Sequence, residues 1–269
     1  MRYLHWRSNL PTVGWLAATF AGAFLLHEVA VVVFTLPIEA VGFPRSLLRP
    51  STTVLELVIP LAIVSFFTLA VARKLDHGMD VLIEPSLQAT RERAARRPVD
   101  PWEDEEYSNA RAFSELSLTP DPVTYPPRRS IPVLIRAGAM AQFFLIAVIA
   151  IRNITVYEVT EESTAALLSG GVGVLAVAVA EELLFRGTLL MTSRDLFRRE
   201  WQAVVLSLVL FAIWQFGMIP LGTDWTMAVL IAARSIVTGF GFYCVRVMTG
   251  HLWPAIIAHT LWGFFVFVL

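Results

Sequence analysis

Seven stretches of this chain are long and apolar enough to cross a lipid bilayer, and this feature restricts its fold more than any other. A membrane-spanning helix needs roughly 20 mainly apolar residues. The whole chain is 56% hydrophobic and only 16% charged, which argues against a water-soluble globule. The sequence therefore predicts an all-α, polytopic membrane protein with about seven transmembrane helices. The expected spans are 13–36, 53–72, 132–151, 163–191, 201–219, 225–248 and 251–269.

These spans divide the chain into four expected parts. Residues 1–72 hold two N-terminal transmembrane helices, and residues 73–130 form a cytoplasmic polar loop. Residues 131–162 hold the third transmembrane helix with an outer loop, and residues 163–269 form a core of four transmembrane helices. The loop contains 20 of the 43 charged residues of the chain together with several prolines. A segment of this composition is expected to be partly disordered.

Basic residues beside the spans predict the orientation of the bundle. When the spans alternate in direction, most of these residues fall on one side of the membrane, which the positive-inside rule assigns to the cytoplasm. Arg45 and Arg49 lie on the opposite side and argue against this assignment. The expected protein is a multi-pass protein of the inner or plasma membrane, with a cytoplasmic N-terminus and an outer C-terminus. The supporting residues are Arg2, Arg7, Arg73, Lys74, Arg194, Arg198, Arg199 and Arg246.

Three charged side chains, Glu181, Glu182 and Arg186, interrupt the fourth expected span. A charged group costs about 2.5–3.5 kcal/mol at the centre of a bilayer on insertion scales, so such residues usually face the bundle interior and mark a functional site. Residues four apart share a helix face, so Glu182 is expected to pair with Arg186, while Glu181 points about 100° away. Glu181 is therefore the candidate general base. The structural alternative is a helix-stabilising ion pair, which needs only one of the two glutamates.

Two further polar residues are expected near the depth of Glu181. Glu181, Gln215 and His259 each lie 13 to 15 residues from a charged residue near one common end of their helices. Their heights in the membrane should therefore agree to within about one turn. A lone histidine in an apolar helix is often a satisfied core residue, but opposite two buried glutamates a functional His259 is the favoured interpretation. The three side chains are expected to line one polar cavity.

The motifs EELLFRG at 181–187, FAIW at 211–214 and TGHLWPAIIAH at 249–259 together resemble the CPBP or Abi family. This family comprises the CAAX prenyl endopeptidases of the Ras-converting type and bacterial bacteriocin-processing and immunity proteins. The resemblance covers roughly residues 165–269. It implies that the first glutamate of EExxxR activates water together with the histidine of an FxxxH motif. It also implies that an HxxxN motif supplies a histidine and an asparagine that stabilise the oxyanion.

The chain matches the first of these motifs completely and departs from the other two. Gln215 stands where the resemblance expects the histidine of FxxxH, and Gly263 stands where it expects the asparagine of HxxxN. A glutamine side chain cannot accept a proton at neutral pH. Losing a general base typically lowers a rate by a factor of about 10²–10⁴, and losing one oxyanion donor by about 10²–10³. The catalytic set that remains is Glu181, Glu182, Arg186, Gln215 and His259.

No cofactor is expected, and a divalent metal is poorly supported. Glu181, Glu182 and His259 would be the only ligands in the motif set, without a second imidazole. The net charge of −1 provides no basic patch for nucleic acid, so nucleic acid is not an expected partner. Membrane lipids are the expected surroundings, with a membrane protein or a peptide as the further expected partner.

Other ionisable residues lie at or near membrane depth. Such groups seek partners, and Arg234 is expected to pair with Glu28 or Glu56. The functional alternative is a polar path for a proton or small solute, although no repeat or pair of broken helices supports a transporter. The residues of this second set are His27, Glu28, Glu56, Arg136 and Arg234.

Three functional interpretations follow. The first is an attenuated or inactive glutamate intramembrane endopeptidase that keeps a membrane cavity for a peptide, lipid or partner protein. The second is an active, glutamate-dependent CAAX-type or intramembrane endopeptidase. The third, ranked well behind, is a proton-coupled carrier or an accessory transport subunit.

Overall fold

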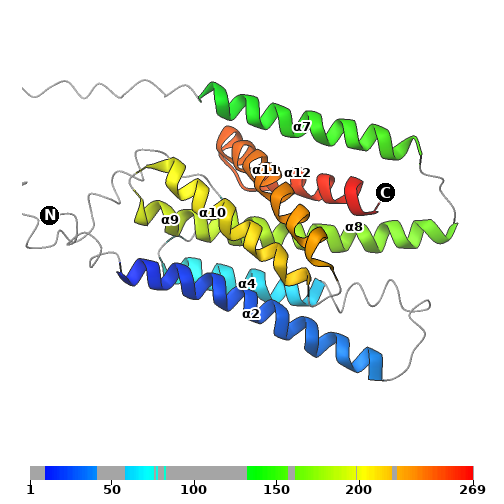
Figure 1. The fold of residues 1–269 in the computed structure, drawn as a ribbon, viewed down its shortest axis with the longest axis horizontal. Coiled ribbons are helices and arrows are strands. Elements are labelled where there is room, and N and C mark those ends of the chain that lie inside the picture. Colours follow the sequence, from blue (N-terminus) through cyan, green and yellow to red (C-terminus); the bar gives the residue numbers. More distant parts are fainter. Residues whose placement is uncertain are drawn as a thin grey trace, which may run out of the picture.

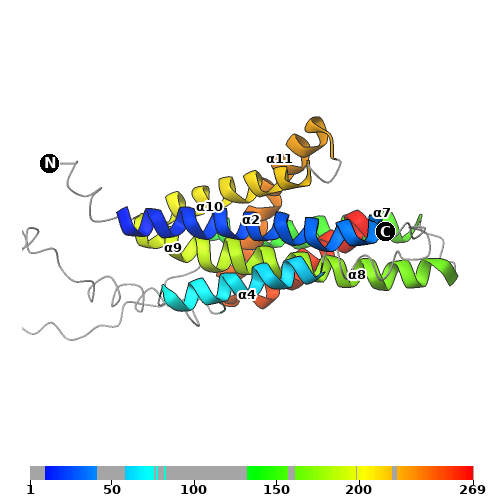
Figure 2. The same cartoon turned by 90° about the horizontal axis from the view of Figure 1, so that it is seen from below.

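The computed structural model describes residues 10–40, 58–75, 77, 82, 132–156, 161–197, 199–219 and 223–268. These residues form helices that run back and forth along the bundle and pack side by side, as Figure 1 and Figure 2 show. The predicted all-α architecture is confirmed. In chain order the elements are α2 (Leu10–Ala40), α4 (Ile59–Lys74), α7 (Val133–Ile154), α8 (Glu161–Glu181), the π-helix η3 (Glu182–Leu189), α9 (Leu190–Leu196), α10 (Glu200–Trp214), the 3₁₀ turn η4 (Gln215–Met218), α11 (Trp225–Thr249), α12 (Trp253–Gly263) and the π-helix η5 (Phe264–Val268).

Five stretches of the described residues are long and apolar enough to cross a membrane: Pro11–Val33, Val133–Ile154, Leu167–Leu196, Glu200–Gly217 and Trp225–Thr249. The second and seventh expected spans correspond to the 16-residue α4 and to the shorter apolar helix Trp253–Val266. Exposed tryptophans are typical of the boundary between lipid and water. Three of them stand at the starts of α10, α11 and α12, namely Trp201, Trp225 and Trp253.

Local sequence signals explain where α11 begins and ends and where α12 begins. The side chain of Asp224 accepts a hydrogen bond from the backbone N–H of Met227 at 3.0 Å and so caps the start of α11. Gly250 ends α11 with a φ of 75°, a left-handed conformation that favours glycine. Pro254 lies in the first turn of α12, where its missing N–H breaks no helical hydrogen bond. These signals fix the start of the helix that carries His259.

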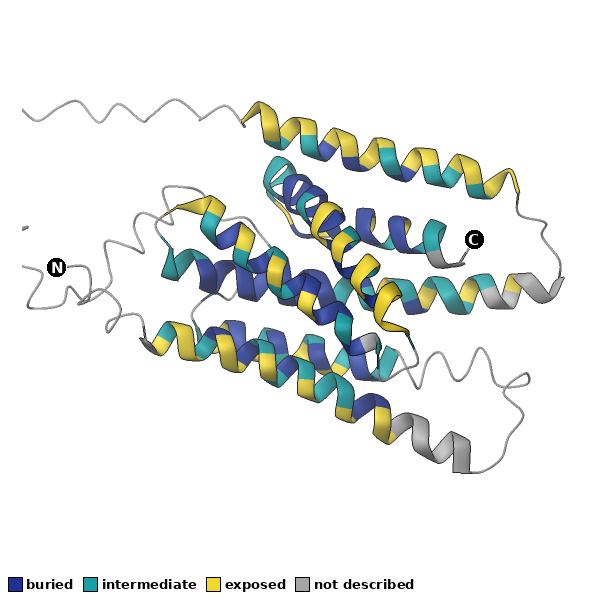
Figure 3. Ribbon diagram, viewed as in Figure 1, coloured by how far each residue is buried: buried dark blue, intermediate teal, exposed yellow. Residues whose placement is uncertain are grey.

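The helix that carries the charged motif lies at the centre of the bundle. Every residue from Ala180 to Ser193 is buried, as the continuous dark blue segment in Figure 3 shows. The π-helix η3 contacts α2, α4 and α10, while α8 packs against α12. A helix surrounded on all sides can bury charged groups only if neighbouring helices supply their partners. The fold therefore requires the motif residues to interact with other spans.

Helix α7 packs at the edge of the bundle through a narrow stripe of small residues. The place of a Cβ on Gly138 would lie 2.6 Å from the Cys244 sulfur, so the backbones of α7 and α11 approach closely there. Ala139, Gln142 and Ile146 are buried, whereas most of the large apolar side chains of α7 are exposed, which suits contact with lipid. Helix α7 thus closes the bundle over α11 without reaching the charged motif.

Polar contacts gather at the end of the bundle where α4, α9 and α11 finish and α2, α10 and α12 begin (Figure 1). Arg194 donates from Nε to both carboxylate oxygens of Glu200 at 3.0 Å, and the Tyr243 hydroxyl donates to Glu200 at 2.9 Å. His77 Nε2 lies 3.1 Å from an oxygen of Asp195. The assignment of this end to the cytoplasm stays a prediction. Arg2, Arg7, Arg45, Arg49, Arg198 and most of the 73–130 loop lie outside the described residues.

Candidate active site

The two glutamates of the motif lie at a change of helix type. Glu181 is the last residue of α8, and Glu182 is the first residue of the π-helix η3. The sequence predicted one regular α-helix over residues 163–191, and in this respect the prediction was wrong. A π-helix has a wider turn than an α-helix, so successive side chains diverge by a smaller angle, and such segments often occur at functional sites. Both carboxylates can therefore face the same neighbouring helix.

Glu182 is the centre of a buried charge cluster. Its Oε1 lies 3.0 Å from Nη1 of Arg186, in a close ion pair whose geometry is not that of an aligned hydrogen bond. The same oxygen lies 2.9 Å from Nδ1 of His259, and Arg246 of α11 is near enough to act on it electrostatically. Glu182 and Arg246 are 0% exposed and Arg186 is 2% exposed. The predicted pairing of Glu182 with Arg186 is present, and two further helices contribute to it.

Glu181 has different partners on each of its carboxylate oxygens. The indole N–H of Trp214 donates to Oε1 at 3.0 Å, and Nε2 of His259 lies 3.5 Å from Oε2. The side-chain amide of Gln215 interacts with the same carboxylate. His259 therefore lies between the two glutamates and presents one ring nitrogen to each. A neutral imidazole can donate from only one nitrogen, so only a protonated ring can donate to both carboxylates.

Aromatic rings hold the imidazole and the guanidinium in place. The ring of Phe242 stacks on His259 with a centroid separation of 4.5 Å and an interplanar angle of 19°. The guanidinium carbon of Arg186 lies 4.1 Å from the centre of the Phe211 ring, a distance that favours a cation–π interaction. Phe211 in turn meets His259 edge to face at 6.3 Å. These contacts fix the orientation of the His259 ring and the Arg186 guanidinium without adding polar groups.

Gly239 of α11 leaves the space that the Arg186 guanidinium occupies. A Cβ at this position would lie 2.6 Å from Nη2 of Arg186 and 3.0 Å from side-chain atoms of Leu208 and Phe211. We expect Gly239→Ala to lower the free energy of unfolding by about 1–3 kcal/mol, the usual cost of overpacking. Denaturant titration of the purified protein in mixed micelles measures this effect.

The control for this prediction is Gly14→Ala in α2, where an added Cβ meets nothing within 4 Å. Alanine favours a helix over glycine by up to about 1 kcal/mol, so this variant should be neutral or more stable. Equal stability losses in Gly239→Ala and Gly14→Ala would contradict the close approach of α11 to Arg186.

The structure also shows what stands at the positions where the resemblance expects a histidine and an asparagine. Gln215 is buried and begins η4, directly after Trp214. Gly263 ends α12, and a Cβ there would lie 2.6 Å from a methyl carbon of Val174 on α8. The space that a side chain at 263 would need is thus filled by Val174. Where glycine replaces the expected asparagine at position 263, α12 packs closely on α8.

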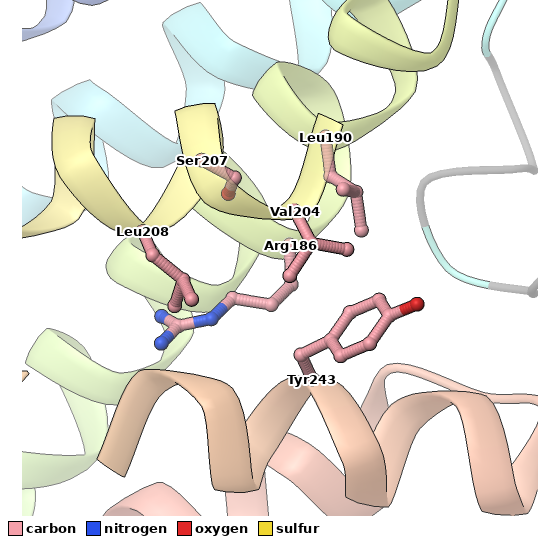
Figure 4. Close-up of a pocket in the computed structure, with 6 residues that line it drawn as sticks. All are labelled: Arg186, Leu190, Val204, Ser207, Leu208 and Tyr243. Atoms are coloured by element: carbon pink, nitrogen blue, oxygen red, sulfur yellow. The ribbon is translucent and has the colours of Figure 1, made fainter. Parts of the chain in front are cut away.

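A small pocket lies on the Arg186 side of the cluster. Figure 4 shows Arg186 between α10 and α11, with its long side chain passing beside Tyr243 and toward Leu208. The space open to a water-sized group is about 10 Å³, near the minimum of about 10–15 Å³ that one water molecule needs. This pocket has no room for a peptide. Its lining residues are Arg186, Leu190, Val204, Ser207, Leu208 and Tyr243.

The second set of ionisable residues has its own contacts. Nδ1 of His27 lies 3.1 Å from Oε1 of Glu28, and the guanidinium of Arg234 lies 5.9 Å from the centre of the Trp262 ring. Arg136 is exposed on α7. Glu56 lies outside the described residues, so the expected pairing of Arg234 with Glu28 or Glu56 stays a prediction.

Sequence reasoning placed Glu181, Glu182, Arg186, Gln215 and His259 in one site, and the structure brings these five side chains together; their roles stay predictions. It missed Trp214, Phe242 and Arg246. The adjacency of Trp214 to Gln215 was a signal for the first of these, whereas only the packing of α11 shows the other two. In the described part of the chain, no group of three or more His, Cys, Asp or Glu side chains is placed to hold a metal ion. The prediction that no cofactor is needed remains untested.

Comparison with known proteins agrees with the motif analysis. Residues 163–265 match the family model described as type II CAAX prenyl endopeptidase Rce1-like. The matched segment begins in α8 and ends in η5, so it contains both glutamates, Arg186, Gln215 and His259. Neither the comparison with curated proteins nor that with solved structures found a match. The chain is therefore a CAAX-protease-like integral membrane protein whose residues 163–265 are similar to the type II CAAX prenyl endopeptidase Rce1-like family.

Proposed function

We propose that this protein is a CAAX-protease-like membrane protein whose endopeptidase activity is attenuated or lost, and that it retains a membrane cavity that binds a peptide, a lipid or a partner protein. The observation that carries the proposal is the environment of Glu181. Trp214 and His259 contact its two oxygens, and the neighbouring Gln215 cannot accept a proton. These contacts take up one acceptor direction on each oxygen of Glu181. The base would have to activate water without the second imidazole that the resemblance expects at position 215.

The position of Gly263 supports the same proposal. The resemblance expects an asparagine there as an oxyanion donor, and one such donor is worth a factor of about 10²–10³ in rate. Val174 fills the space that an asparagine side chain at position 263 would occupy. Restoring the donor therefore requires two changes on two helices. The packing of Val174 against Gly263 therefore fits a site that no longer uses an oxyanion donor at position 263.

One contact favours the active endopeptidase as the second candidate. Nε2 of His259 lies 3.5 Å from Glu181, so the site retains one pair of a carboxylate and an imidazole. Such a pair could polarise a water molecule that displaced Trp214 from Glu181. The two candidates differ in the rate expected from the unaltered chain. The first predicts cleavage far slower than that of a complete site, or none, and the second predicts cleavage at ordinary rates that Glu181→Ala abolishes.

A repair experiment tests the proposal. We expect the triple variant Gln215→His, Gly263→Asn and Val174→Ala to cleave a prenylated CAAX peptide, because it restores the missing imidazole and makes room for the amide. The restored base alone corresponds to a gain of about 10²–10⁴ in rate. Cleavage is measured by mass spectrometry on purified full-length protein in liposomes.

Two further variants make the result interpretable. Val174→Ala alone should remain silent, since it opens space without adding a catalytic group. Glu181→Ala introduced into the triple variant should remove the gained activity. Ordinary cleavage rates in the unaltered chain, lost on Glu181→Ala, would overturn the proposal in favour of the second candidate. A peptide, lipid or protein that co-purifies with the unaltered chain at fixed stoichiometry would support the binding role.

A further inference from the structure

We propose that Trp214 is a positioning residue that holds the Glu181 carboxylate and separates it from the surface of the bundle beside α2. The inference concerns the same site as the proposed function but does not depend on whether that site is catalytic. It assigns a role to a residue to which the resemblance gives no catalytic part. It also assigns a role to α2, which lies outside the segment matched by the family model.

The first argument is the contact between the indole and the carboxylate. The N–H of Trp214 donates to Oε1 of Glu181 at 3.0 Å, and both side chains are buried, with residue exposures of 7% and 6%. This hydrogen bond pairs a buried donor with a buried acceptor, and breaking it would leave both groups unsatisfied. It has one well-defined geometry because indole has a single donor. Trp214 thus fixes the orientation of this carboxylate.

The second argument is what lies on the other side of the indole. The ring of His27 lies 5.2 Å from the Trp214 ring, and Nδ1 of His27 lies 3.1 Å from Oε1 of Glu28. The side chains of His27 and Glu28 are 13% and 21% exposed, so this pair reaches the surface of the bundle. A Cβ on Gly217 would lie 2.9 Å from Oε1 of Glu28, so the Glu28 carboxylate packs against η4. The indole of Trp214 therefore lies between the partly exposed pair His27–Glu28 and the buried carboxylate of Glu181.

The third argument is that the other side chains around the charge cluster are tightly packed and buried. Phe242 stacks on His259, and the Arg186 guanidinium lies over Phe211, with all four residues at most 8% exposed. Trp214 itself rests on Phe24 at 5.7 Å and on Phe185 at 5.8 Å, both edge to face. Of the groups that surround Trp214, His27 and Glu28 are polar and partly exposed. Movement of the indole would thus connect Glu181 with the polar groups of α2.

The physical consequence is a latent polar space. Removing the indole would leave a void bounded by the Glu181 carboxylate on one side and the His27 ring on the other. Voids with several polar partners take up water, whereas apolar voids stay dry. We therefore expect a small side chain at 214 to bring water, and any small reagent, to Glu181. In the unaltered protein the same groups are reached only when Trp214 moves.

Chemical labelling of Glu181 tests the inference. Dicyclohexylcarbodiimide reacts with protonated buried carboxyl groups of membrane proteins and leaves a stable N-acylurea, which peptide mass spectrometry locates. We expect Trp214→Ala to raise the labelling rate of Glu181 by about tenfold or more, as for a site that no longer needs local opening. Trp214→Phe keeps a ring and loses the N–H, so its rate should lie between those of the unaltered protein and Trp214→Ala. Glu181→Gln should abolish the labelled site.

A matched control distinguishes this role from general loosening. Trp262 on α12 is as buried as Trp214, at 7% exposure, and Trp262→Ala should leave the labelling of Glu181 unchanged. If Trp214→Ala does not fold, Trp214→Leu takes its place, with the same expected direction. Equal labelling in Trp214→Ala and the unaltered chain would overturn the inference, as would an equal rise in Trp262→Ala. The readout requires no cleavage, so it can fail while the proposed function holds, or hold while that function fails.

Discussion

Replacing Glu182 with alanine is expected to lower the free energy of unfolding by about 3–5 kcal/mol, the cost of breaking a buried ion pair by removing one partner. The carboxylate lies 3.0 Å from Arg186 and 2.9 Å from His259, and Arg246 lies close by. None of these side chains can reach water without disrupting the bundle. The variant would therefore leave two buried guanidinium groups without their shared anion. Denaturant titration in mixed micelles measures the loss.

Glu200 provides the matched control for this prediction. It also pairs with an arginine, Arg194, but its side chain is 47% exposed. Exposed ion pairs contribute about 0–1 kcal/mol because water solvates both charges and the side chains lose entropy on pairing. Glu200→Ala also removes the acceptor of the Tyr243 hydroxyl, which contributes about 0.5–1.5 kcal/mol, and should still cost less than Glu182→Ala. Similar losses in the two variants would show that the buried cluster is not the electrostatic centre of the fold.

The second large effect is expected from Phe185→Ala in η3. Phe185 is 0% exposed and contacts the rings of Phe20, Phe211 and Trp214 at centroid distances of 6.4, 5.0 and 5.8 Å. Truncating a buried phenylalanine typically costs about 3–5 kcal/mol. In a bilayer we expect the lower end, about 3 kcal/mol, because lipid is as apolar as the core and only the lost packing counts.

Phe144 on α7 is the corresponding control, since it is 72% exposed and can be surrounded by lipid in both the folded and unfolded states. Phe144→Ala should change the free energy of unfolding by less than about 0.5 kcal/mol, as is usual for exposed positions. The same mixed-micelle titration compares the two variants. A loss in Phe185→Ala no larger than that in Phe144→Ala would contradict the central position of η3.

Most of the fold could be predicted from the sequence because the lipid bilayer reduces the choice of structures so strongly. Apolar stretches of sufficient length have to be helices, since a spanning backbone must satisfy its own hydrogen bonds. Of the seven expected spans, five meet the length and hydropathy criterion in the described part of the chain. The start of α12 likewise follows from a local signal, because Pro254 lies in its first turn. Each of these features depends on local sequence alone.

The geometry of the glutamates could not be predicted in the same way. A regular α-helix would have turned Glu181 about 100° from Glu182. The structure instead has a π-helix from Glu182 onward, and His259 lies between both carboxylates. A π-helix has no local sequence signature. It persists where contacts with other helices compensate for its poorer backbone geometry. Those contacts come from α2, α4 and α10, while α11 and α12 contribute contacts to the charged side chains.

The sequence by itself determined that this protein is a helical membrane protein with two glutamates and an arginine buried in one span, because length, hydropathy and the cost of burying charge are local properties. It also determined which residues depart from the family motifs, namely Gln215 and Gly263. Only the tertiary structure decided what each charge contacts. Trp214 and His259 reach Glu181 from two other helices, Val174 fills the space beside Gly263, and His27 and Glu28 approach from α2. These contacts join residues far apart in the chain, so they depend on how helices pack and cannot be read from any single segment.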